Sequence, residues 1–137
     1  MRAQRERGYA FVAGVEHEPS GRLATVRLRP LHEPQGGIVV DLLFASSGIE
    51  PEIVARADRL ALTPGLELPV AQTGHLIAMK LLADDPGRPQ DRGDIAALIG
   101  AATPADLELA REAVDLITAR GFDRGRDLRA ALAEAVA

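Results

Sequence analysis

Cysteine is absent from this sequence, and aromatic residues make up only 3% of its 137 residues. Without cysteine there are no disulfides and no thiolate-ligated zinc sites. No apolar run approaches the ~18 residues that a membrane-spanning helix needs. The N-terminal arginines, Arg2, Arg5 and Arg7, have no apolar segment behind them, so no signal peptide is predicted. We therefore expect a cytoplasmic protein that does not contact a membrane.

An excess of basic residues is also missing. The chain has 16 Lys and Arg against 20 Asp and Glu, a net charge of −4 and a pI near 5.4. Nucleic-acid binders are usually basic, so this balance does not support a nucleic-acid acceptor such as tRNA, although a small local basic site is compatible with it. The histidines lack metal-ligand spacing, and neither a Gly-x-Ser-x-Gly turn nor a Gly-x-x-x-x-Gly-Lys loop is present. Hydrolase and P-loop functions are therefore unsupported.

The hydrophobic content and the pattern of residues along the chain predict an α+β fold. Hydrophobic residues are 47% of a chain long enough to bury a core, which indicates one domain over residues 1–137. We expect a sheet-rich part over 1–72, with a mixed β-sheet, and a helical bundle over 73–137. A hairpin is predicted to join 9–16 to 23–29, and residues 60–62 and 66–71 are predicted to form a second short hairpin or an edge element.

The run Ile38–Phe44 is apolar except for Asp41. Such a run fits a central strand buried on both faces. A carboxylate there is costly unless it is paired, hydrogen-bonded or bound to a metal. Asp41 is thus either functional, a strand-end residue in water, or the partner of a nearby arginine.

Residues 73–99 predict a helix, a polar turn and a second helix. Thr73 suits the N-cap of the first helix, in which Lys80 is the only charge between Leu76 and Ala83. A helix that is apolar on all sides is normally buried, so Lys80 must reach water along its stem or face an anion. In the second helix, Asp91 suits the N-cap and Asp94 suits the third helical position. At these positions the helix dipole favours both acids, and they would then have a stabilising role only. Their like charges favour a nearby cation, for which Lys80, Arg88 and Arg92 are candidates.

The last third predicts two packing helices to which we assign no chemistry. Thr103-Pro104-Ala105-Asp106 is a strong helix start, and Leu107, Ala110, Val114 and Ile117 then keep helical spacing. A final helix from about Arg126 is expected to bury Leu128, Leu132 and Val136.

The block from Leu76 to Leu98 resembles the second conserved block of the AbiEii-type toxin nucleotidyltransferases. The likeness rests on an apolar helix containing Met79-Lys80, then Arg88, then Asp91-x-x-Asp94 followed by an apolar stripe. It extends upstream to Val39-Val40-Asp41-Leu42-Leu43, which looks like the strand that carries the family's third metal-binding carboxylate. The resemblance therefore implies a nucleotidyltransferase-like fold over most of the chain.

The resemblance also implies roles for five residues. Asp41 would be a metal ligand, and Lys80 would place its ammonium on the triphosphate. Asp94 and Asp91 match the family's later acid, which acts in catalysis or orients the lysine, and Arg88 would help to bind the nucleotide. Asp41 and Lys80 would then converge on one pocket.

One block of the family is missing. The sequence contains no Asp-x-Asp strand after a glycine turn, and a single carboxylate cannot hold two magnesium ions. We therefore expect Mg²⁺ and a nucleoside triphosphate only if the site is completed, and no transfer by the chain alone. Residues 1–7 resemble the helix that follows that strand in the family, which suggests a longer protein whose start lies upstream.

Three hypotheses follow from these observations. The chain is an incomplete AbiEii-like nucleotidyltransferase, a non-catalytic interaction module, or half of a split enzyme whose partner chain supplies the Asp-x-Asp strand. An uncovered sheet edge would favour a homodimer or a heteromer, for instance with an antitoxin-type protein. Neither the nucleotide nor the acceptor can be inferred from the sequence.

Overall fold

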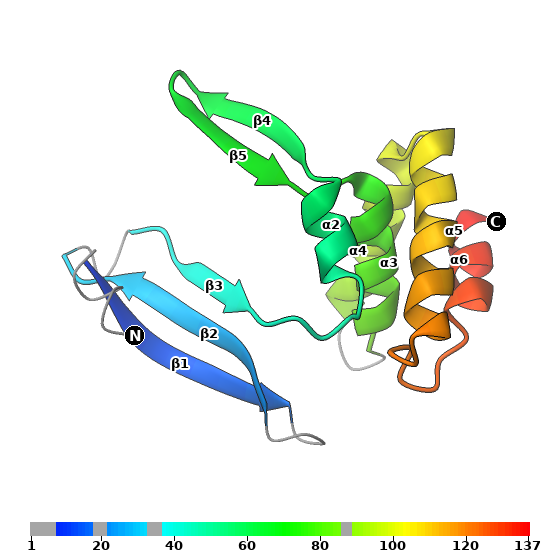
Figure 1. Ribbon diagram of the computed structural model, residues 1–137, viewed down its shortest axis with the longest axis horizontal. Coiled ribbons are helices and arrows are strands. Elements are labelled where there is room, and N and C mark those ends of the chain that lie inside the picture. Colours follow the sequence, from blue (N-terminus) through cyan, green and yellow to red (C-terminus); the bar gives the residue numbers. More distant parts are fainter. Residues whose placement is uncertain (1–7, 18–21, 33–36, 86–88) are drawn as a thin grey trace. The chain divides into compact units, whose positions relative to one another are not determined.

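The computed structural model describes residues 8–17, 22–32, 37–85 and 89–137. The fold is α+β, with antiparallel sheets of three and two strands and with helices that follow them (Figure 1). The chain forms two compact units, Met1–Ser46 and Ser47–Ala137. The division falls earlier than the predicted change from sheet to helix at residue 72, because the second hairpin belongs to the helical unit. The helical segment expected over 1–7 lies outside the described residues.

The first unit contains a three-stranded sheet in the order β1-β2-β3. Its strands are β1 (Tyr9–His17), β2 (Arg22–Pro30) and β3 (Val40–Leu43). The predicted hairpin of β1 and β2 is confirmed, and its turn at 18–21 lies outside the described residues. Val26 and Leu28 are buried whereas Arg27 and Arg29 are exposed, as the alternation along this strand predicts.

Two predictions about the sheet are wrong. Every strand pairing in the described residues is antiparallel, so the sheet is not mixed. The apolar run around Asp41 is not a central strand either, because β3 is short and pairs only with β2 among the described residues. Ile38 is 78% exposed and Leu43 is 71% exposed. Apolar composition fits a buried strand only where neighbours cover it, and within the described part of the chain β3 has a neighbour on one side alone.

The second unit begins with a short helix and the second predicted hairpin. Helix α2 (Glu50–Ala55) has Pro51 in its first turn, where proline is tolerated. The hairpin consists of β4 (Asp58–Thr63) and β5 (Leu66–Val70). All of its strand residues except Val70 are exposed. Leu60 lies opposite Leu68, whereas Arg59 is bonded to Glu67, so the hairpin has an apolar and a charged face.

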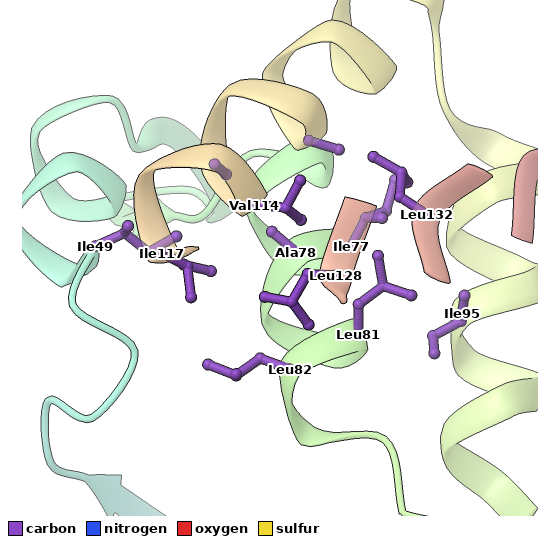
Figure 2. Packing of buried hydrophobic residues seen from close by; sticks show 12 residues of the cluster. Ile49, Ile77, Ala78, Leu81, Leu82, Ile95, Val114, Ile117, Leu128 and Leu132 are labelled. Atoms are coloured by element: carbon purple, nitrogen blue, oxygen red, sulfur yellow. The ribbon is translucent and has the colours of Figure 1, made fainter. Parts of the chain in front are cut away.

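Four helices complete this unit and enclose the main core. They are α3 (Thr73–Ala83), α4 (Pro89–Ala101), α5 (Pro104–Ala119) and α6 (Leu128–Val136). Figure 2 shows the core, to which α3 contributes Ile77, Ala78, Leu81 and Leu82. Leu128 and Leu132 are buried as predicted, but Val136 is 38% exposed. Among the described residues, no helix is long and apolar enough to cross a membrane.

The starts of two helices show what local sequence does and does not determine. Thr103 and Asp106 form a reciprocal capping box at the start of α5, as the sequence predicts. For α3 the prediction is wrong, because Gln72 is the N-cap residue and Thr73 is already helical. Gly74 in the first turn of α3 matters for packing, since a Cβ there would come within 2.7 Å of the Leu109 Cβ. The close contact between α3 and α5 therefore requires glycine at position 74.

Candidate functional site

Lys80 lies on the one side of α3 that the core does not cover. Its neighbours Ala78, Leu81 and Leu82 are buried, whereas the Lys80 side chain is 35% exposed. The lysine stem therefore passes along apolar surface, and the ammonium reaches the boundary with water. Lys80 is also the only lysine in the sequence, and the other residues counted as positively charged at pH 7 are arginines.

Two carboxylates of α4 lie at the Lys80 ammonium. Lys80 Nζ donates to Asp94 Oδ2 over 2.6 Å, and its distance to Asp91 Oδ1 is 3.5 Å. The two acids are three residues apart, which places both on the same side of a helix. The structure thus brings together three of the predicted site residues, and Lys80 is the cation that the acid pair was expected to need.

The two acids occupy different environments. The side chain of Asp91 is 2% exposed and that of Asp94 is 53% exposed. The interpretation of Asp91 as an N-cap is wrong, because α4 begins at Pro89 and Asp91 lies inside its first turn. A carboxylate at that position still interacts favourably with the helix dipole, but its burial makes the Lys80 charge part of what stabilises it.

The electrostatics of the cluster keep the lysine charged. The hydrogen bond to Asp94 raises the pKa of Lys80, and burial opposes this rise without reversing it. An ammonium with a raised pKa holds its proton at neutral pH and does not act as an amine nucleophile. Its chemistry is therefore that of a fixed positive charge and hydrogen-bond donor.

Asp41 lies in a different setting from the one predicted. It pairs directly with Arg27 across β2 and β3. Arg27 Nε donates to Asp41 Oδ1 over 2.7 Å, and Arg27 Nη2 donates to Asp41 Oδ2 over 2.6 Å. This bidentate bond is the main reason that the pKa of Asp41 is lowered. Of the alternatives left open by the sequence, the pair with a nearby arginine is the one observed.

The residues present do not fit the two magnesium ions that the resemblance implies. Both oxygens of Asp41 are engaged by Arg27, and the Asp91–Asp94 pair faces an ammonium. Within residues 8–17, 22–32, 37–85 and 89–137, no three metal-binding side chains gather at one point. Asp41 and Lys80 also belong to different units, so their convergence on one pocket stays a prediction. Arg88 lies outside the described residues.

One polar residue of this unit was not singled out from the sequence. His75 is 2% exposed, and its buried Nδ1 has no hydrogen-bond partner among the described residues. Burial is the largest cause of its lowered pKa, and the charge of Arg56 adds to it, while Glu52 and Glu112 act in the opposite direction. A lone histidine at the start of an apolar helix was the available signal, but it does not reveal which helices cover the ring.

Comparison with known proteins adds no assignment. A scan against protein-family models finds no matching family, and a search of curated proteins finds no similar sequence. The likeness to AbiEii-type nucleotidyltransferases therefore rests on the sequence motifs alone.

Proposed function

We propose that this chain is a nucleotidyltransferase-like protein of the AbiEii kind that binds nucleotide phosphates at Lys80 but does not transfer a nucleotide by itself. The observation that supports binding is the cluster of Lys80, Asp91 and Asp94, in which two helices bring a charged amine to the edge of the core. Phosphate oxygens are good acceptors for such an ammonium. The absence of an Asp-x-Asp pair from the sequence is the reason to expect no transfer.

Nucleotide binding tests this proposal directly. We expect the purified chain to bind ATP weakly in calorimetric titrations and Lys80→Ala to abolish the binding, whereas Lys80→Arg retains part of it. Arg129→Ala is a matched control, because Arg129 is an exposed base whose partner is Asp115. Binding that survives Lys80→Ala would contradict the assignment of this site.

A second experiment tests the expected lack of transfer. The purified chain is incubated with Mg²⁺, an α-labelled nucleoside triphosphate and either RNA or protein acceptors. We expect no labelled product. Magnesium-dependent labelling by the chain alone would overturn the proposal that it is inactive without a further carboxylate pair.

The exposed strands favour a second candidate, an interaction module that pairs with another copy of the chain. No described strand lies along the outer side of β3, and Leu43 and Phe44 there are 71% and 50% exposed. An unpaired, apolar edge is a template for pairing with another strand. This candidate predicts self-association in sedimentation at micromolar concentration and its loss in Leu43→Lys, with no effect of Lys80→Ala. A strictly monomeric chain would exclude it.

A further inference from the structure

The two carboxylates at Lys80 cannot have the same role, because their surroundings differ. Asp91 is almost completely enclosed, and its oxygen is the more distant of the two, at 3.5 Å from the ammonium. Asp94 makes the short contact of 2.6 Å, although half of its side chain is in water. A buried carboxylate loses much by separating from its cation, whereas an exposed one can rotate into solvent at little cost.

We propose that Asp94 is an exchangeable counter-ion of Lys80 that an incoming phosphate displaces, and that Asp91 is the positioning residue that holds the lysine in place. The inference rests on the proposed function, because it takes Lys80 to be the amine that binds the phosphate. It adds a regulatory property of that site. The anion site is closed by the chain's own Asp94, and it opens when Asp94 leaves.

The charge of the cluster supports this exchange. Counted over these three side chains alone, one ammonium and two carboxylates carry a formal charge of −1, and the second carboxylate opposes the approach of a phosphate to Lys80. If Asp94 is removed, the cluster of Lys80 and Asp91 becomes neutral, and one strong donor position on Nζ is released. Carboxylate and phosphate oxygens accept from an ammonium in the same way, so they compete for that position.

The proposal predicts different effects for the two acids. Asp94→Asn should strengthen anion binding, since the amide keeps the size of the side chain and loses its charge. Asp91→Asn should weaken anion binding relative to Asp94→Asn, because the lysine loses its buried anchor. A catalytic or orienting role for Asp94 predicts the reverse, namely a loss of binding or no change when this acid is replaced.

The test is titration of the whole chain with inorganic tripolyphosphate, without metal and at low salt. We expect Asp94→Asn to bind up to about fivefold more tightly than the unsubstituted chain, which corresponds to the upper end of the range measured for exposed ion pairs. Asp94→Asn with Lys80→Ala should lose this gain. Asp115→Asn is the matched control, because Asp115 is also a half-exposed helical acid paired with a base, Arg129.

The outcomes separate the two proposals. Lys80-dependent binding that Asp94→Asn leaves unchanged or weakens would overturn the exchange and leave the proposed function standing. An equal gain in anion affinity in Asp115→Asn would also overturn the exchange, since the lower net negative charge of the chain would then explain the gain. Anion binding that is undetectable in every variant, or that does not depend on Lys80, would contradict the proposed function itself.

Discussion

Two apolar runs of this chain each carry a single charge, Asp41 in a strand and Lys80 in a helix. The helix is enclosed, so its lysine meets a buried acid and an exposed one at the edge of the core. The strand is exposed, and its acid forms a cross-strand ion pair with Arg27 instead. A single charged residue in an apolar segment therefore indicates a possible site only when other parts of the protein bury that segment. Four experiments test this contrast, beginning with the largest expected effect.

The first experiment compares apolar deletions in the two runs. Ile77 is 0% exposed, so Ile77→Ala should lower the free energy of unfolding by about 2–5 kcal/mol. Leu43→Ala removes an exposed side chain and should change it by no more than about 0.5 kcal/mol. Scanning calorimetry measures both, because it registers the unfolding of either unit. A large cost at Leu43 would mean that β3 is covered in solution.

The second experiment measures how closely the lysine-bearing helix packs. Gly74→Ala forces a methyl group against Leu109 of α5 and should destabilise the protein by about 1–3 kcal/mol. Gly100→Ala is the control, because nothing lies within 4 Å of a Cβ at that helical position. It should stabilise the protein by about 0.5–1 kcal/mol through helix propensity. Equal effects in chemical denaturation would contradict the close approach of α3 and α5.

The third experiment removes one charge from each site. Asp91→Asn leaves Lys80 beside an amide at the edge of the core and should reduce stability by about 1–3 kcal/mol. Asp41→Asn breaks an exposed pair, so we expect no measurable change in the melting temperature, at low or at high salt. If Asp41→Asn proved the more damaging, the strand acid would be buried in solution and the contrast would fail.

The smallest effect concerns pH. Because His75 has a folded pKa below its unfolded value of 6.5, the unfolded chain binds more protons there. Stability should therefore fall as the pH drops below 6.5 and should be fully present above that value. His75→Gln should flatten the slope of stability against pH between pH 7 and pH 5, measured by urea titration. An unaltered slope in His75→Gln would show that the ring is accessible to water when the protein is folded.

Sequence patterns were sufficient where the deciding information is local. The capping box at Thr103, both hairpins and the helical spacing of Ala110, Val114 and Ile117 all follow from neighbouring residues. They also identified Lys80 as one of three candidate cations for the acid pair, and the structure brings Lys80 to both acids.

Sequence patterns gave wrong predictions where the burial of a residue depends on distant parts of the chain. The run around Asp41 has the composition of a buried strand, but burial depends on covering neighbours that composition does not encode. The predicted helix starts at Thr73 and Asp91 lie one and three residues too late, because several neighbouring residues can serve as caps. The different exposures of Asp91 and Asp94 likewise depend on packing, and no spacing rule predicts them.

Because Lys80 is the sole lysine of these 137 residues and lies in the last turn of α3, a lysine-specific endoprotease can cut this chain at one peptide bond only. That bond is inside a regular helix packed on the core, so it becomes cleavable only when α3 opens. The rate of the single cut then reports the opening free energy of the helix that holds the proposed site. Anything that binds there and favours the closed helix should slow the cut, which gives a binding assay that needs neither a label nor knowledge of the natural ligand.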